Sequence, residues 1–266
     1  MSLNMRGKYP WRCGVTSYLL PADLITNVKH IAGQVDDVQL LFFECAANTC
    51  LSHPVDKAAL QEIADQYDLS YTVHLPTDIR LGAADERVRQ QGIDEIERLV
   101  AELDSLRPIC YDLHLNKETA VRDEPWLENL DTSLSALQGR LGEKAARITI
   151  ENIDYPLEQI RDLIAGNNFR LCLDMGHILK YGHDWQSALT EYVPAAQHIH
   201  YHGVQDNRDH QSITVSDMAR CRELGAALYE ADFRGVLTLE LYSLQQVRES
   251  GDILKQAWES FLNHKE

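Results

Sequence analysis

Two short segments contain the residue types that most often bind metal ions in enzymes. Asp174 and His177 follow the apolar segment 170–173, and the segment 198–203 contains three histidines at alternate positions. Carboxylates and imidazoles together suit zinc, manganese or iron, whereas magnesium and calcium prefer sites made of oxygen alone. An Asp-x-x-His sequence can equally be a helix N-cap followed by an unrelated histidine. The metal interpretation therefore depends on whether other segments end in the same way.

Four further apolar segments also end in a titratable side chain. The residues concerned are His74, His114, Glu151 and Glu240. If these segments are parallel strands, their C-terminal ends share one rim of the sheet, and the side chains converge although they are far apart in sequence. Residues two apart on a strand face the same side, so His200 and His202 share a face. Isolated caps could explain one position, but they explain the recurrence poorly.

Apolar or β-branched segments recur along the chain, each followed by a polar turn and a helical pattern. They cover residues 11–20, 38–44, 69–76, 109–115, 146–152, 170–177, 198–203 and 235–242. Strands that alternate regularly with helices are typical of a (β/α)8 barrel. We therefore predict an α/β fold, a single TIM barrel over residues 1–266 with a metal site at the C-terminal rim of its strands. An open doubly wound sheet is the alternative, but it would normally carry a G-x-G-x-x-G or Walker sequence, and neither is present.

Composition and charge narrow the class of protein. With 266 residues and 44% hydrophobic residues, the chain can bury one large core. The net charge of -16 disfavours nucleic acid as a partner, because binding a phosphate backbone needs a positive surface. The sequence has no long apolar segment and no signal-peptide pattern, so we predict a cytoplasmic protein that does not bind membranes. The six cysteines include no Cys-x-x-Cys pair, and Cys45 and Cys50 match no standard zinc spacing.

A polar loop after the seventh segment, residues 205–210, supplies further candidate ligands. We select Asp209 and His210 from it, with Asp206 as the alternative carboxylate. The full predicted ligand set is His74, His114, Glu151, Asp174, His177, His200, Asp209, His210 and Glu240. Such a set could hold two or three zinc or manganese ions per chain, or alternatively one. Clustered ions stabilise both the attacking and the leaving oxygen of a displacement at phosphorus.

Basic and aromatic side chains near the predicted rim could contact a substrate. Arg80, Lys117 and Arg208 lie in predicted strand-to-helix loops and could neutralise a phosphate, although each could equally be an ordinary solvated base. Tyr18 and Tyr242 lie at strand ends and could line a pocket. We predict a small anionic substrate; the sequence does not determine the oligomeric state.

Several of these motifs resemble the xylose isomerase-like TIM-barrel superfamily, which includes endonuclease IV and the sugar epimerases. The motifs are Val73-His74-Leu75-Pro76, Asp112-Leu113-His114, Ile150-Glu151-Asn152 and Leu173-Asp174-Met175-Gly176-His177, together with His200 and Glu240. The resemblance covers nearly the whole chain. For the isomerases and epimerases it implies one metal ion held by Glu151, Asp174, His200 and Glu240, with two of the glutamates exchanging protons with the substrate.

The endonuclease IV pattern adds further histidines to that set. Here His74, His114 and His177 match it, whereas Arg208-Asp209-His210 departs from its Asp-x-His loop sequence and leaves the loop carboxylate open. A narrower similarity concerns residues 14–23 and 71–82, which look like the cobamide-remodelling phosphodiesterases. Those enzymes hydrolyse the phosphodiester in the nucleotide loop of vitamin B12-type cofactors.

We therefore predict a metal-dependent phosphodiester hydrolase that acts on cobamides through a metal-bound hydroxide. Its catalytic residues would be Glu151, Glu240 and His177. The alternative is a single-metal sugar or sugar-phosphate isomerase or epimerase that uses Glu151 and Glu240 as an acid/base pair. A barrel that binds without catalysis, or an AP endonuclease, are further alternatives, because fold does not determine function.

Overall fold

The computed structural model describes residues 3–43, 55–117 and 122–264. Its parallel strands form a closed barrel in the order β1-β10-β7-β6-β5-β4-β3-β2. The strands are β1 (Arg12–Thr16), β2 (Asp37–Leu41), β3 (Ser70–His74), β4 (Tyr111–His114), β5 (Ile148–Glu151), β6 (Arg170–Asp174), β7 (Ala196–Tyr201) and β10 (Val236–Leu239). Each strand falls within or next to a predicted segment, and the predicted TIM-barrel fold is confirmed.

Helices follow the strands, and several of them begin at a side chain that caps their first turn. The α-helices are α1 (Leu24–Ile31), α2 (Lys57–Tyr67), α3 (Glu86–Leu103), α4 (Asp123–Leu141), α5 (Arg161–Gly166), α6 (Met175–Lys180), α7 (Trp185–Ser187), α8 (Met218–Glu230) and α9 (Leu244–Asn263). Asp23, Asp85 and Ser243 each accept a hydrogen bond from a backbone N–H in the first turn of α1, α3 and α9. None of the helices in the described part of the chain is long and apolar enough to cross a membrane.

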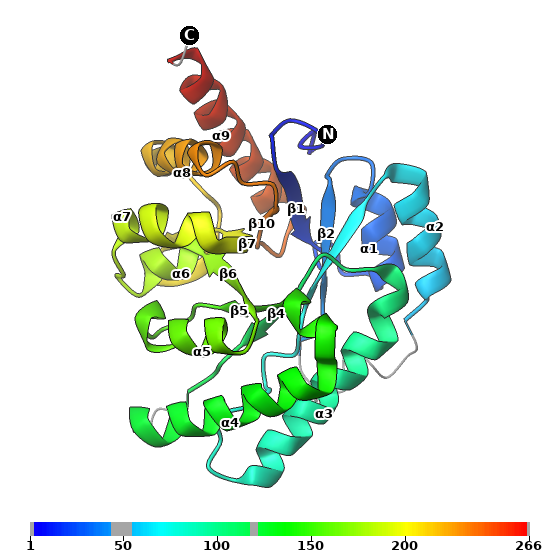
Figure 1. The fold of residues 1–266 in the computed structure, drawn as a ribbon. Helices are drawn as coiled ribbons and strands as arrows, with labels where there is room; N and C mark the ends of the chain where they lie inside the picture. Colours follow the sequence, from blue (N-terminus) through cyan, green and yellow to red (C-terminus); the bar gives the residue numbers. More distant parts are fainter. Residues whose placement is uncertain (1–2, 44–54, 118–121, 265–266) are drawn as a thin grey trace. The chain divides into compact units, whose positions relative to one another are not determined.

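Contacts within the chain define two compact units. The first comprises Met1–Gln39, Ala59–Ser70 and Leu173–Glu266, and the second comprises Leu40–Ala58 and Tyr71–Cys172. In the first unit β1 pairs with β2 and β10, β10 pairs with β7, and α8 lies beside α9 (Figure 1). In the second unit β4 pairs with β3 and β5, and β5 pairs with β6. The assignment of residues 1–266 to one domain stays a prediction.

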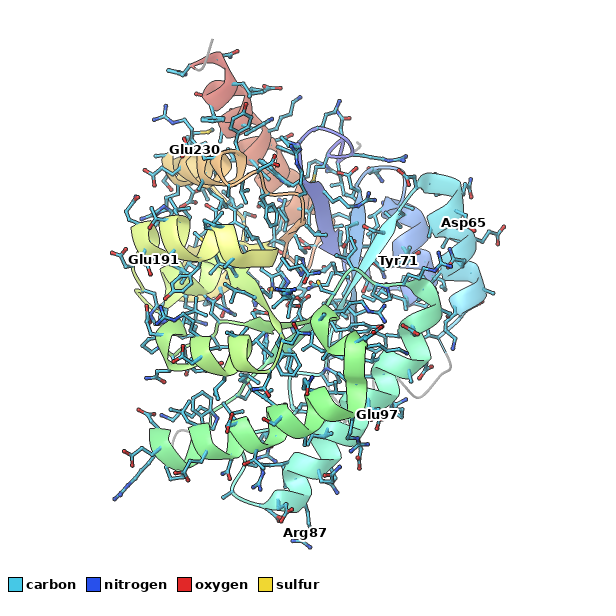
Figure 2. The ribbon with its side chains drawn as sticks, viewed as in Figure 1. Asp65, Tyr71, Arg87, Glu97, Glu191 and Glu230 are labelled. Atoms are coloured by element: carbon cyan, nitrogen blue, oxygen red, sulfur yellow. The ribbon has the colours of Figure 1, made fainter. Side chains whose placement is uncertain are left out.

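The strands are buried on both faces, which explains why their apolar pattern does not alternate clearly. Every residue of β2 and β5 is buried. Figure 2 shows Tyr71 of β3 inside the protein, whereas Asp65 of α2 and Arg87 of α3 point outward. Polar side chains that occur on such buried strands, as at the end of β5, therefore need a specific explanation.

The prediction of an irregular loop after the seventh segment is wrong, because this segment contains two strands. Strands β8 (Gly203–Gln205) and β9 (Arg208–Gln211) form an antiparallel hairpin. The two turn residues Asp206 and Asn207 have φ values of 51° and 58°. Asp and Asn tolerate this left-handed conformation, which two-residue hairpin turns require. The turn signal was thus present in the sequence. Glu44, Cys45 and Cys50 lie outside the described residues.

A glycine in the loop between β3 and α3 makes room for the largest buried side chain of α4. A Cβ atom at Gly82 would lie 2.2 Å from Cδ1 of Trp126, which is 1% exposed. We expect Gly82→Ala to lower the free energy of unfolding by about 1–3 kcal/mol, because overpacking forces a rigid indole to move. Gly139→Ala on α4 is the control, since its Cβ meets nothing within 4 Å. Equal urea midpoints for the two variants would contradict this prediction.

Candidate metal centres

The β3–β5 cluster consists of His74, His114 and Glu151, the last residues of strands β3, β4 and β5. Strand register places His114 opposite Glu151. Nε2 of His74 lies 3.2 Å from Nε2 of His114, and Oε2 of Glu151 lies 3.4 Å and 3.2 Å from these two nitrogens. Glu151 is fully buried and His74 is 4% exposed. Three ligand atoms from three strand ends therefore converge on one point.

The separations in the β3–β5 cluster fit a tetrahedral metal ion. Bonds of 2.0–2.1 Å to zinc give distances of about 3.3 Å between neighbouring ligand atoms. The hydrogen bond on the far side of His74 also fits, because its Nδ1 lies 2.8 Å from the carbonyl oxygen of Leu75. A carbonyl only accepts, so Nδ1 carries the proton and Nε2 keeps its lone pair for an ion. The residues present can thus hold a divalent ion.

The β6–β10 cluster consists of Asp174, His200 and Glu240. Asp174 ends β6, His200 lies in β7, and Glu240 directly follows β10. Nδ1 of His200 lies 3.3 Å from Oε2 of Glu240 and 4.0 Å from Oδ2 of Asp174. All three side chains are at most 4% exposed. Two buried carboxylates repel each other unless a cation compensates them, and a divalent ion does so effectively.

A three-histidine cluster, His177, His202 and His210, lies next to Asp174 in the same unit. The three residues each offer a ring nitrogen within 4.8 Å of the others. Oδ2 of Asp174 lies 3.3 Å from Nδ1 of His177 and 3.4 Å from Nε2 of His202. His210 contributes from β9, where it has a positive φ of 49°. Asp174 is therefore shared between the β6–β10 cluster and the three-histidine cluster.

His202 is the member of this group that our sequence interpretation did not select as a ligand. It follows β7 and is fully buried. Its ring packs where Gly176 has no side chain, since a Cβ at Gly176 would lie 2.2 Å from His202 Cε1. The backbone nitrogen of His210 lies 3.1 Å from Nδ1 of His202. The alternate spacing of His198, His200 and His202 was the available signal, but only the hairpin brings His210 to it.

Asp209, the predicted loop ligand, forms an ion pair in the structure. Its carboxylate pairs with the ammonium of Lys180 at the end of α6. Burial would raise the pKa of Asp209, but the hydrogen bond and the charge of Lys180, together with the neighbouring His210, lower it by more. Asp206, the alternative, is exposed in the hairpin turn. Neither Asp206 nor Asp209 is a member of the clusters described above. The other predicted ligands are all members of them, namely His74, His114, Glu151, Asp174, His177, His200, His210 and Glu240. Their roles as ligands stay predictions.

The predicted substrate contacts lie at or near the surface. Lys117 pairs with Asp123 and stands 5.9 Å from the ring centre of Trp126, so its charge is partly compensated. Arg208 is exposed and lies 3.9 Å from Asp206, and Arg80 is also exposed. Tyr18 is 48% exposed. Tyr242 is 36% exposed, and its ring centre lies 5.0 Å from that of His210. The ring of Tyr242 thus lies against a member of the three-histidine cluster.

The charge of His202 makes the stability of the metal-free protein depend on pH. Burial lowers the pKa of His202, but the Asp174 carboxylate outweighs this and raises it from 6.5 to about 9. This stabilisation is complete below about pH 6.5 and is lost as the pH rises through 9. A shift of this size corresponds to about 3 kcal/mol. We expect wild-type protein in chelator to lose stability over this range relative to His202→Gln. Parallel urea-unfolding curves from pH 6 to 9.5 would contradict this prediction.

Comparison with known proteins supports the broad resemblance. A model of the xylose isomerase-like TIM-barrel family matches residues 34–261. An uncharacterized protein of Methanocaldococcus jannaschii is 31% identical over 124 residues, which are 44% of this chain and 49% of that protein. The match thus spans about half the length of this curated relative. The narrower similarity to cobamide-remodelling phosphodiesterases is not supported by these matches and stays a prediction.

Solved structures resemble the chain over nearly its whole length. A D-tagatose 3-epimerase-like protein has a TM-score of 0.77 at 18% identity, covering 96% of this chain and 100% of that one. An L-ribulose 3-epimerase has a TM-score of 0.74 at 14% identity, covering 96% and 97%. The 3-keto-D-glucoside 4-epimerase of E. coli has a TM-score of 0.71 at 15% identity, covering 93% and 98%. At such identities these similarities establish the fold alone. Because the family model matches well over half of the sequence, this chain belongs to the xylose isomerase-like TIM-barrel family.

Proposed function

We propose that this protein is a metal-dependent isomerase or epimerase that acts on a sugar or a sugar phosphate. The observation that carries this proposal is the β6–β10 cluster, in which two buried carboxylates approach one imidazole. A mixed carboxylate and imidazole set suits manganese or zinc. The similar solved structures include several sugar epimerases, which supports the choice of substrate class. Phosphodiester hydrolysis becomes the second candidate.

We assign proton transfer to Glu151 and Glu240. Epimerisation beside a carbonyl group needs one base to remove a proton from carbon and one acid to return a proton to the opposite face. A bound divalent ion would polarise the substrate carbonyl and so make the neighbouring C–H more acidic. Glu151 is fully buried, and the imidazoles of His74 and His114 within 3.4 Å can share its proton. Glu240, at 3% exposed, is protected from bulk water in the same way.

We further assign recognition of the substrate's outer part to residues beside the three-histidine cluster. Tyr242 has a partly exposed ring near His210 and could stack on a sugar face. Arg208 is exposed on the β8–β9 hairpin and could pair with a phosphate. Further candidates for contacts with the substrate are Arg80 and Lys117, which could neutralise a phosphate, and Tyr18, which could line a pocket. A phosphorylated substrate would explain why an acidic protein carries an exposed arginine beside this cluster.

Hydrogen exchange with solvent tests the proposed chemistry without knowledge of the natural substrate. Protein stripped with a chelator and reloaded with manganese or zinc is incubated in D2O with a panel of ketoses, aldoses and their phosphates. We expect deuterium to enter the carbon beside the carbonyl group of at least one compound, as followed by NMR. The stripped protein is the control. The proposal is wrong if no compound exchanges while the reloaded protein hydrolyses a phosphodiester.

Two additional histidine-containing groups favour the second candidate, a metal-dependent phosphodiester hydrolase. The β3–β5 cluster has a spacing suited to a zinc ion, and the three-histidine cluster offers nitrogen ligands near Asp174. A single-metal epimerase does not need either of them. Cobamides and generic phosphodiesters are the substrates to test for this candidate.

The two candidates differ in how many ions they need. Elemental analysis after dialysis should give one ion per chain for the epimerase, and two or three for the hydrolase. The double variant His74→Gln/His114→Gln separates them further. It should retain hydrogen exchange within about tenfold if these side chains only assist Glu151. A hydrolase that needs an ion in the β3–β5 cluster would instead lose its activity.

A further inference from the structure

A buried glutamine on β2 faces the imidazole of the β6–β10 cluster. Gln39 lies in the middle of β2 and is fully buried. Its Nε2 lies 2.7 Å from Nε2 of His200, which is also fully buried. Both residues belong to the first compact unit. Burying a polar amide is costly unless it forms hydrogen bonds, so the contact with His200 explains a glutamine at this position.

The two ring nitrogens of His200 have different neighbours. Nδ1 faces the carboxylates of Glu240 and Asp174 at 3.3 Å and 4.0 Å, whereas Nε2 faces Gln39. A neutral imidazole carries its proton on one of these nitrogens. An ion bound between Asp174 and Glu240 needs a lone pair on Nδ1, which requires the proton on Nε2. The tautomer of His200 therefore decides whether it can serve as a ligand.

The side-chain amide of Gln39 can match either tautomer. With its nitrogen toward His200, as in the structure, the amide donates to Nε2 and the ring proton lies on Nδ1, facing the carboxylates. After a half turn about its last side-chain bond, the amide oxygen accepts a hydrogen bond from Nε2–H instead. The lone pair of Nδ1 is then directed at the carboxylates and at an ion between them. A side-chain amide carries its donor and its acceptor on two different atoms of one planar group. No hydroxyl, amine or carboxylate has this arrangement.

We propose that Gln39 is a positioning residue that selects the tautomer of His200 needed for metal binding. This inference rests on the proposed metal centre. On ion uptake the ring loses its Nδ1 proton to solvent and gains one from solvent at Nε2, so His200 stays neutral. The amide of Gln39 turns and accepts the new Nε2–H. Gln39 thereby orients the ring and holds Nδ1 toward the ion, although it touches neither the ion nor the substrate.

A second buried histidine contact, between β7 and β10, provides a matched control. Nε2 of His198 lies 2.8 Å from Oγ1 of Thr238, and the rings of His198 and His200 are 4.5 Å apart. Removing the Thr238 hydroxyl disturbs a buried histidine contact of the same kind, but not the ring that approaches the carboxylates. Thr238→Val should therefore lower stability without altering metal affinity.

The test follows the ring nitrogens of His200 by NMR in protein labelled with 15N-histidine. Zinc is titrated into stripped wild-type protein and the variants Gln39→Met, Gln39→Glu and Thr238→Val, and His200→Gln assigns the signal. We expect the wild-type ring to change from the Nδ1–H to the Nε2–H form. Gln39→Met should weaken zinc binding about 10- to 100-fold. Gln39→Glu, which can accept from Nε2–H, should bind at least as tightly as wild type, and Thr238→Val should be unchanged.

Three outcomes would overturn the inference. They are that Gln39→Met binds zinc with wild-type affinity, that the tautomer of His200 is the same with and without zinc, and that Gln39→Glu loses zinc binding as Gln39→Met does. If Gln39→Met does not fold, the inference is still tested by the His200 tautomer in the wild type with and without zinc, and by the zinc affinity of Gln39→Glu. Wild-type protein whose His200 signal does not respond to zinc or manganese would overturn the proposed metal centre as well. If the wild-type His200 signal responds to zinc and Gln39→Met still binds zinc with wild-type affinity, the role of Gln39 is refuted but the metal centre is not.

Discussion

The Asp174→Asn variant is expected to bind zinc or manganese at least about 100-fold more weakly than wild type and to lose its activity. Oδ2 of Asp174 lies within 4.0 Å of ring nitrogens of His177, His200 and His202, so one carboxylate serves two clusters. Loss of hydrogen-bond partners behind a ligand already costs about 10–100-fold in affinity, and loss of a ligand charge should cost more. Competition with a chromophoric chelator measures the affinity.

The design of this variant separates charge from folding. Oδ1 of Asp174 accepts the backbone N–H of His177 over 2.8 Å and caps α6, and an asparagine oxygen can keep that cap. Asp209→Asn is the matched control, because Asp209 pairs with Lys180. If Asp209→Asn lost the ion and Asp174→Asn kept it, the loop carboxylate would be the ligand and Asp174 only a helix cap.

The Glu151→Gln variant is expected to lower the rate of hydrogen exchange between substrate and solvent by about 100- to 10,000-fold. This is the range that a positioned general acid or base contributes. The carboxylate is fully buried and has two imidazole nitrogens within 3.4 Å. Glutamine has nearly the same volume as glutamate, but its amide group cannot act as a general acid or base near neutral pH. Deuterium incorporation, measured at saturating metal, separates this loss from a change in metal content.

The controls for Glu151→Gln concern the charge and the cluster around it. Glu191→Gln, on the outer surface (Figure 2), removes the same charge without touching a cluster and should leave the rate unchanged. An active Glu151→Gln enzyme would exclude Glu151 from proton transfer. If Glu151→Gln and His74→Gln both stopped phosphodiester hydrolysis and neither affected exchange, the β3–β5 cluster would belong to a hydrolase.

Much of the fold was predictable because it depends on local patterns. The apolar segments became strands, and Asp23, Asp85 and Ser243 start helices because their side chains satisfy free N–H groups wherever they precede a helical pattern. The predictions failed at segment ends, as in residues 205–210. There an Asp-Asn turn makes a hairpin that general polarity alone does not reveal.

The sequence by itself determined the strand-and-helix order, the family, and most of the cluster members. The reasons are that strand ends in a parallel barrel share one orientation and that carboxylates and imidazoles are recognisable as possible metal ligands from their residue type. Only the tertiary structure decided which of them lie within ligand distance. It turned Asp209 to Lys180, brought His202 to Asp174, and set Gln39 against His200. The physical reason is that hydrogen bonds and ion pairs act over about 3–4 Å, and spacing along a chain does not specify such distances between residues on different strands.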